Sequence, residues 1–175
     1  MLTHNHKMIA IRKYTNSDLN EAMAIWNSVV DDGVAFPQDD RLTEITANQF
    51  FNSQSYMGVA YDKASNEIVG LYILHPNNVG HCGHICNASY AVKADKRGLH
   101  IGEQLVNDSL RMGALLGFRI LQFNAVVATN IHALHLYERL GFTRLGVIPQ
   151  GFRMSDGHYE DIIPHYIKLV GDEWL

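Results

Sequence analysis

The chain has 175 residues, of which 47% are hydrophobic and 18% are charged, and its formal net charge is -4. This length suffices for one well-buried core and is too short for two ordinary domains, so we expect a single domain over residues 1–175. The acidic balance argues against nucleic acid as a partner, and no run of about 20 apolar residues could span a membrane. Residues 1–7 lack the apolar core of a signal peptide, which predicts a loose N-terminal tail and a cytoplasmic protein.

Hydrophobic periodicity predicts strands and helices that alternate along the chain. The first half is expected to contain a strand at 9–14, helices at 18–30 and 43–51, a hairpin of strands 56–61 and 68–74, and a strand that ends at Val92. The second half is expected to contain a helix at 101–116, a strand at 119–127, a helix around Tyr137, and strands at 142–148 and 159–170. Pro164 suggests an edge strand or a bulge in the last of these.

The two cysteines of the chain, Cys82 and Cys86, are predicted to be free thiols. On one strand they would lie about 13 Å apart at ~3.3 Å per residue, which is beyond disulfide reach. With His81 and His84 they form the run His-Cys-Gly-His-Ile-Cys, which superficially resembles a metal site. Structural zinc sites usually take paired ligands from separated segments, so we expect no metal, and a zinc-binding interaction module is kept as an alternative.

The turn after Val92 contains groups that suit an anionic ligand. Its glycines, Gly98 and Gly102, allow positive φ and close approach of the backbone. The first N–H groups of the following helix have no partner inside the helix and carry partial positive charge. Lys96 and Arg97, with Lys93 nearby, add formal positive charge. A phosphate group would fit there, although an ordinary tight connection explains the same residues.

Residues 130–142 form a second motif, on a predicted amphipathic helix. Asn130 is a candidate N-cap, Gly141 is placed where a helix stops, and Tyr137 lies on the apolar stripe. The stripe also contains Ala133, Leu136 and Leu140. Taken alone, this motif is a capped helix with a core tyrosine.

Together the two motifs resemble the GCN5-related N-acetyltransferase (GNAT) family. In that family an Arg/Gln-x-x-Gly-x-Gly/Ala turn binds the pyrophosphate of acetyl-coenzyme A (acetyl-CoA), and an Asn-x-x-Ala-x-x-Leu-Tyr-x-x-x-Gly-Phe segment supplies a tyrosine near the thioester sulfur. Here the turn runs from Arg97 to Gly102, and Asn130 to Phe142 matches the second segment without a gap. His100 replaces the usual middle glycine, and its Cβ disfavours the positive φ that glycine would adopt.

The resemblance implies an α/β fold with a mixed, mostly antiparallel sheet of about seven strands and about four helices. Two central parallel strands would splay apart and admit the cofactor. It also implies acetyl-CoA as acetyl donor and a small-molecule amine as acceptor, and it leaves a homodimer open. The implied cofactor contacts are Tyr90, Ala91, Val92, Arg97, Gly98, Leu99, His100, Ile101, Gly102 and Asn130.

The strand before the turn lacks the glutamate with which many family members take the amine proton. Residues 85–92 contain no carboxylate, and their polar groups are Asn87 and Ser89. Asn124 is expected at a comparable level on the next strand. An amide is no base near neutral pH, but it can hydrogen-bond the thioester carbonyl or the acceptor. Asn87 and Asn124 are therefore predicted catalytic and substrate-binding residues, unless they merely satisfy backbone groups where the sheet opens.

A narrower resemblance concerns fungal enzymes that act on azetidine-2-carboxylate and related proline analogues. It is based on residues 84–92, 97–100 and 123–124, and in that branch the matching asparagines lie at the acetyl-transfer site. It implies an amino acid or a proline analogue as acceptor. An antibiotic, a polyamine or a protein N-terminus is the alternative acceptor, and a non-catalytic acetyl-CoA sensor is the alternative of another class.

Tyr137 is predicted to donate a hydrogen bond to the leaving thiolate. Full proton transfer from a phenol of pKa near 10 to a thiol of pKa near 8.5 would be uphill by roughly 2 kcal/mol. The general base stays open among several groups: Asp31, Asp32, Glu44, a water held by Asn87, and bulk solvent.

The acceptor pocket is predicted at residues 30–37, because loops on a rigid sheet carry specificity. Phe36 is the candidate wall of this pocket and a candidate substrate contact, although ordinary loop chemistry explains these residues equally well. Weaker candidates for the opposite wall are Phe152, Arg153, His158 and Tyr159, of which Arg153 could bind an acidic group.

Overall fold

A seven-stranded sheet organises the chain, as seen in the computed structural model, which describes residues 8–169. The predicted tail at residues 1–7 and the predicted strand end at Val170 lie outside the described residues. In sheet order the strands are β1 (Ile9–Lys13), β2 (Tyr56–Asp62), β3 (Ile68–Pro76), β4 (Ile85–Val92), β5 (Ile120–Phe123), β9 (His165–Lys168) and β6 (Thr143–Arg144). Neighbouring strands are antiparallel except for β4 and β5, which are parallel.

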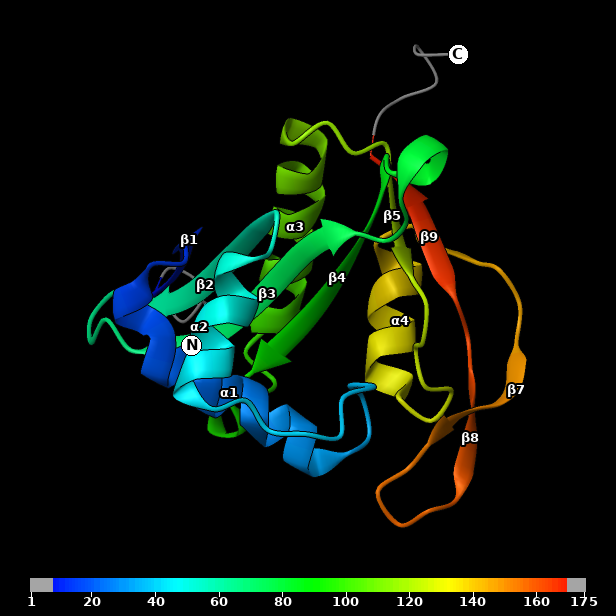
Figure 1. Cartoon of the computed structure of the whole chain (residues 1–175), viewed down its shortest axis with the longest axis horizontal. Helices are drawn as coiled ribbons and strands as arrows, with labels where there is room; N and C mark the ends of the chain where they lie inside the picture. Colours follow the sequence, from blue (N-terminus) through cyan, green and yellow to red (C-terminus); the bar gives the residue numbers. More distant parts are fainter. Residues whose placement is uncertain (1–7, 170–175) are drawn as a thin grey trace, which may run out of the picture.

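Among the described residues, four α-helices cover the sheet, and Figure 1 shows helices on both of its faces. They are α1 (Leu19–Asp32), α2 (Glu44–Asn52), α3 (Ile101–Leu115) and α4 (Ile131–Arg139). Short 3-10 helices occur at Asn16–Asp18, Gly80–Cys82 and Ala94–Lys96. Helices α1 and α2 lie on one face, and α3 and α4 lie on the other. This arrangement confirms the α/β fold with a mostly antiparallel sheet.

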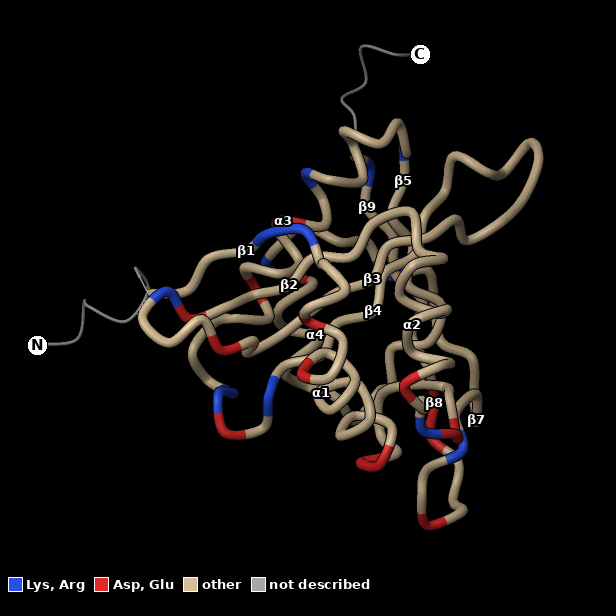
Figure 2. Tube along the Cα trace, turned by 60° about the vertical axis from the view of Figure 1, so that its left-hand side comes forward, with Lys and Arg blue, Asp and Glu red and all other residues tan. Residues whose placement is uncertain are grey.

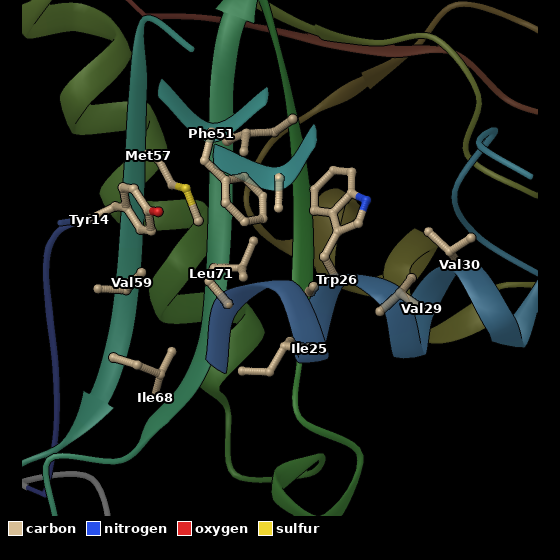
Figure 3. Packing of buried hydrophobic residues seen from close by; sticks show 14 of the residues in the cluster. Tyr14, Ile25, Trp26, Val29, Val30, Phe51, Met57, Val59, Ile68 and Leu71 are labelled. Atoms are coloured by element: carbon tan, nitrogen blue, oxygen red, sulfur yellow. The ribbon is translucent and has the colours of Figure 1, made fainter. Parts of the chain in front are cut away.

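The predicted apolar face of the first helix is buried. Ala22 and Trp26 are 0% and 1% exposed, and Ile25 and Val29 are buried beside them. The Trp26 ring contacts Phe51 of α2, with ring centroids 6.2 Å apart. Figure 3 shows Ile25, Trp26 and Phe51 packed together over the central strands. Burial of this helical stripe fixes α1 to the sheet and therefore fixes the position of the loop that follows it.

The C-terminal strands differ from the prediction. The strand predicted at 142–148 is reduced to β6, and the strand predicted at 119–127 ends at Phe123. The run predicted at 159–170 is broken around Pro164, which has no N–H to donate to a sheet ladder. Its first part is β8 (Tyr159–Ile162), which pairs with the unpredicted strand β7 (Ile148–Arg153) in a separate two-stranded ribbon.

Strands β4 and β5 separate soon after they begin. Their ladder has two registered pairs, Ile85 with Ile120 and Cys86 with Leu121. The predicted splay is therefore present, and Figure 1 shows the two strands converging at one end and diverging toward the other. Asn87 and Asn124 both lie beyond the last registered pair.

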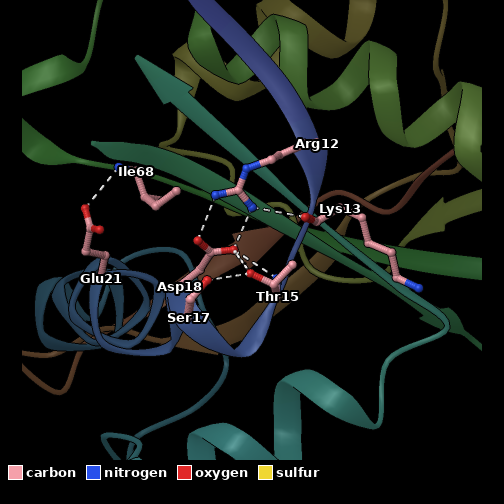
Figure 4. A network of polar contacts seen from close by, with 7 residues as sticks. All are labelled: Arg12, Lys13, Thr15, Ser17, Asp18, Glu21 and Ile68. Atoms are coloured by element: carbon pink, nitrogen blue, oxygen red, sulfur yellow. Dashed lines mark hydrogen bonds and ion pairs between the residues drawn. The ribbon is translucent and has the colours of Figure 1, made fainter. Parts of the chain in front are cut away.

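A buried aspartate connects the first strand to the first helix (Figure 4). Asp18 is 5% exposed and accepts two hydrogen bonds from the Arg12 guanidinium, at 2.7 and 2.8 Å. The Thr15 backbone N–H donates to the same carboxylate at 2.9 Å. Burial by itself would raise the pKa of Asp18, but these hydrogen bonds outweigh it and lower the pKa.

Asp18→Asn is expected to lower the free energy of unfolding by about 1–3 kcal/mol near neutral pH, because it weakens charge-assisted bonds to a buried group. Since folding depresses the pKa of Asp18, its contribution is present above the unfolded-state pKa and is lost as pH falls through the folded-state value. Denaturant unfolding as a function of pH measures this, with Asp40→Asn at an exposed aspartate as control. Equal stability of Asp18→Asn and the parent would contradict the assignment.

Candidate active site

The gap between the splayed strands contains a cavity of about 230 Å³. Its lining combines four parts of the chain: the loop after α1, the middle of β4, the segment after β5, and α4. Predicted site residues in this lining are Phe36, Asn87, Tyr90, Asn124, Asn130 and Tyr137. Of the described residues that line this cavity, none is acidic. The structure therefore brings the three predicted catalytic residues together without a carboxylate among them.

Both asparagines contact a third one, Asn77, which sequence reasoning missed. The Asn124 Nδ2 donates to Asn77 Oδ1 at 2.6 Å, and Asn77 Nδ2 donates back to Asn124 Oδ1 at 3.3 Å. Asn87 Nδ2 donates to the same Asn77 Oδ1 at 3.5 Å, which is long for a hydrogen bond. Gln122 Nε2 also donates to Asn124 Oδ1, at 3.0 Å. Asn124 is thus firmly held, whereas Asn87 is held weakly and can turn toward a ligand.

Tyr137 lies on the side of the cavity formed by α4, within an aromatic cluster. Its ring centroid is 4.4 Å from that of Phe123 and 5.3 Å from that of Phe142. Burial raises the pKa of the Tyr137 phenol above its ordinary value. A raised pKa makes proton transfer to a thiolate still less favourable and leaves hydrogen-bond donation as the feasible role.

Tyr137→Phe is expected to lower kcat roughly 10- to 100-fold, because a hydrogen bond to a charged group contributes about 1.5–3 kcal/mol. The dissociation constant of acetyl-CoA should change little, since the bond strengthens only as the thiolate forms. Single-turnover kinetics and calorimetric titration measure the two quantities. Tyr61→Phe, at a tyrosine outside the cavity lining, serves as control. Unchanged single-turnover kinetics would leave Tyr137 as a packing residue.

The turn before α3 has the glycine-like conformation in spite of its histidine. His100 is the N-cap of α3 and has φ 58°, in the left-handed region. Histidine is among the few non-glycine residues that enter this region with some frequency, so the replacement keeps the backbone path. A Cβ added at Gly98 or Gly102 would meet nothing within 4 Å. The turn therefore presents an open backbone surface at a helix N-terminus, which fits the pyrophosphate of a coenzyme.

The basic residues near the turn are engaged in ion pairs, which the sequence did not predict. Arg97 contacts Asp32 at the end of α1 at 3.0 Å, Lys96 contacts Glu67 at 3.7 Å, and Lys93 also contacts Glu67. Figure 2 shows basic and acidic segments interspersed along the trace rather than gathered apart. Attraction for a phosphate at this turn therefore depends on the backbone N–H groups and the helix dipole more than on unpaired lysines.

A second cavity, of about 490 Å³, adjoins the first at Phe36 and Pro37, which line both. It lies between the loop after α1 and the β7–β8 ribbon. Phe152 and Arg153 line it, and Arg153 forms an ion pair with Asp39 at 3.1 Å. These contacts place the predicted pocket segment 30–37 opposite two of its predicted partners.

Several other candidates lie elsewhere. His158 and Tyr159 are outside both cavity linings, and the His158 ring contacts Asp156 and Glu160. Of the three carboxylates considered as general base, Asp31 lines the larger cavity and pairs with Arg41 at 2.6 Å, whereas Asp32 and Glu44 line neither. The larger cavity thus contains a carboxylate that the smaller one lacks.

The cysteines do not lie on one strand. Cys82 is exposed in the 3-10 helix before β4, and Cys86 is buried in β4, where its Sγ donates to the Ile120 carbonyl at 3.4 Å. Both are free thiols, and burial raises the pKa of Cys86 to about 12. Within residues 8–169, no three His, Cys, Asp or Glu side chains are grouped to hold a metal ion. This geometry does not support a zinc module at these residues.

The second motif is a capped helix, as predicted. Asn130 Oδ1 accepts from the Ala133 N–H at 3.2 Å, and Gly141 ends the helix with φ 87°. Over residues 22–142 the chain matches the model of the acetyltransferase (GNAT) family. The chain belongs to this family. It is an acetyltransferase of GNAT type, and acetyl-CoA is its acetyl donor.

Known proteins resemble the chain over most of its length. N-acetyltransferase aca1 of Schizosaccharomyces pombe is 33% identical over 179 residues, covering 91% of this chain and 85% of that protein. A GCN5-related N-acetyltransferase from Kribbella flavida is 28% identical, with a TM-score of 0.86 and coverage of 93% and 99%. A GNAT superfamily phosphinothricin acetyltransferase from Sinorhizobium meliloti, solved with acetyl-CoA, is 18% identical with a TM-score of 0.87, covering 96% of this chain and 92% of that one. The likeness to this last protein concerns the fold alone.

No α-helix within the described part of the chain is long and apolar enough to cross a membrane.

Proposed function

We propose that the protein transfers the acetyl group of acetyl-CoA to the amine of a small amino acid, and that a proline analogue such as azetidine-2-carboxylate is the preferred acceptor. The observation that carries this proposal is the small, carboxylate-free cavity that contains Asn87, Asn124 and Tyr137. At about 230 Å³ it is smaller than the roughly 300–1,000 Å³ of pockets for drug-sized ligands. This volume suits a small acceptor at the acetyl-transfer centre, with room for one further group of the acceptor in the adjoining cavity of about 490 Å³.

The chemistry follows from the groups present. A neutral amine attacks the thioester carbonyl carbon, the C–N bond forms, and the C–S bond breaks with its electron pair on sulfur. Asn87 donates a hydrogen bond to the carbonyl oxygen as negative charge develops there, and Tyr137 donates one to the departing sulfur. The amine proton reaches the thiolate through solvent, so the products are an amide and free coenzyme A.

Among the residues that the structure describes, the lining of the smaller cavity has no carboxylate to take the amine proton. The ring amine of azetidine-2-carboxylate is about as basic as an ordinary aliphatic amine, so it is mostly protonated near neutral pH and must lose a proton before it attacks. Asp31 in the adjoining cavity and solvent are the candidate bases for this step. Arg153 in the same cavity would bind an acidic group of the acceptor, which would replace Asp39 as its ion-pair partner.

A panel of acceptors tests the proposal. Release of free coenzyme A thiol is followed with azetidine-2-carboxylate, proline, linear amino acids, phosphinothricin, a polyamine, an aminoglycoside and an N-terminal peptide. The highest kcat/KM is expected for a small cyclic or α-amino acid. A kcat/KM far higher for the aminoglycoside or the peptide would overturn the substrate class. Thermal stabilisation by acetyl-CoA without thiol release for any acceptor would instead favour the sensor.

A further inference from the structure

We propose that Asn77 is a positioning residue for acetyl transfer, which holds Asn124 in place and aligns Asn87 with the thioester. This inference rests on the proposed function, because it assumes that Asn87 and Asn124 take part in the reaction. Asn77 lies in the connection between β3 and β4, outside both motifs and outside the lining of the cavity.

The position of Asn77 is fixed by its backbone. Its N–H donates to the Ile85 carbonyl at 2.7 Å, directly after β3 ends with Pro76 opposite Cys86. The amide side chain is therefore carried by the rigid edge of the β3–β4 pair rather than by a loose loop. From there its Oδ1 accepts from both Asn87 and Asn124.

The Asn77 amide joins two elements that the sheet itself does not join at this level. The β4–β5 ladder ends at the Cys86–Leu121 pair; Asn87 follows it on β4, and Asn124 follows the end of β5. The reciprocal amide pair between Asn77 and Asn124, at 2.6 and 3.3 Å, connects the segment after β5 to the β3–β4 pair beyond the ladder. Two parallel bonds between planar groups fix orientation as well as distance.

The three asparagines then differ in role. Asn124 uses its oxygen for Asn77 and Gln122, and one of its N–H groups for Asn77, so it is the anchored member. Asn87 donates one N–H group to Asn77 across 3.5 Å, and this weak contact orients its amide. The second N–H group of the same amide can then donate to the thioester oxygen. Asn77 supports this geometry without touching the reacting atoms.

Asn77→Ala removes the contacts to both partners. We expect kcat to fall about tenfold, less than the roughly 100-fold expected for loss of a direct donor, while the dissociation constant of acetyl-CoA and the melting temperature stay near parental values. Asn77→Ser keeps a polar group for the turn, but its side chain is too short to reach both partners, so it should show the same loss of kcat. This variant tests the proposal if Asn77→Ala folds poorly. Asn78→Ala, at the exposed neighbouring residue, is the matched control.

Two further readouts separate positioning from general support of the fold. In NMR spectra, the side-chain amide signals of Asn87 and Asn124 should shift in Asn77→Ser and stay unchanged in Asn78→Ala. In a double-mutant cycle, Asn77→Ala combined with Asn124→Ala should be about as impaired as the worse single variant, since both remove one shared element. Losses that multiply, or a kcat equal to that of the parent, would overturn the proposal for Asn77. A loss of coenzyme affinity and stability parallel to the loss of kcat would also overturn it.

These results are distinguishable from a failure of the proposed site. If Asn87→Ala and Asn124→Ala both keep full turnover, the asparagines do not take part in the reaction and the proposed function fails at its centre. If both are impaired while Asn77→Ala matches the parent, the site stands and the role of Asn77 is wrong.

Discussion

Replacing Asn87 with alanine is expected to lower kcat by on the order of 100-fold in a protein that stays folded. Removal of one oriented donor from a water-excluded site typically has an effect of this size. Asn87 lies on β4 beyond the last β4–β5 pair, and its one contact to Asn77 is weak, so the fold depends little on its side chain. Steady-state kinetics with acetyl-CoA and a small amino acid measure the effect, and Asn107→Ala, at an exposed residue of α3, is the control.

Asn87→Asp tests the chemical role of this residue more sharply. The aspartate has nearly the same shape, but it replaces the donor with a negative charge near the developing oxyanion. If Asn87 acts as a neutral donor, the kcat of this variant should be about as low as that of Asn87→Ala. A kcat of Asn87→Asp that equals or exceeds that of the parent would show that a general base at this position helps the reaction. The proposed role of Asn87 as a donor would then be wrong.

Gly102→Glu is expected to weaken acetyl-CoA binding about tenfold or more. Gly102 lies in the first turn of α3, and a Cβ there would meet nothing within 4 Å, so the substitution is compatible with the fold. Its carboxylate would occupy the helix N-terminus where the pyrophosphate is expected. Two like charges about 4 Å apart repel by about 1 kcal/mol in bulk water and by about 4 kcal/mol near a protein surface. The affinity for acetyl-CoA should therefore fall about tenfold or more.

The matched control for this variant is Gly102→Ala, which adds a Cβ without charge and should bind almost as well as the parent. At one fixed concentration, acetyl-CoA should raise the melting temperature of the parent and of Gly102→Ala by similar amounts, because the ligand binds the native state, and should raise that of Gly102→Glu by less. Equal stabilisation of all three proteins would place the pyrophosphate somewhere else.

Local patterns predicted the parts of the fold that local physics decides. The apolar stripe of α1 and the capped helix with Asn130 and Gly141 were predicted because helical period and capping are properties of neighbouring residues. The splay followed from the family resemblance, and the structure locates it after Cys86 and Leu121.

Other features depend on residues that are distant in sequence. The β7–β8 ribbon was missed because four of the six β7 residues are exposed in one run, so the strand lacks the apolar alternation that marks a half-buried strand. Ion pairing of Arg97 with Asp32 joins residues 65 positions apart, and the Asn77–Asn124 pair spans 47 positions. The one local signal for Asn77 is a polar residue directly after a strand, which is common in turns and therefore indicates little.

Acetyl transfer to a small ring amine with help from Asn87 is tested most directly by identifying the reaction product by mass spectrometry, with azetidine-2-carboxylate and acetyl-CoA as substrates and Asn87→Ala as the comparison enzyme. The parent is expected to form the N-acetylated ring amine together with one free coenzyme A thiol per product. Asn87→Ala is expected to form the same product on the order of 100 times more slowly. Equal rates for the two proteins, or no acetylated product from any small amino acid while a larger amine is acetylated, would contradict the proposed reaction.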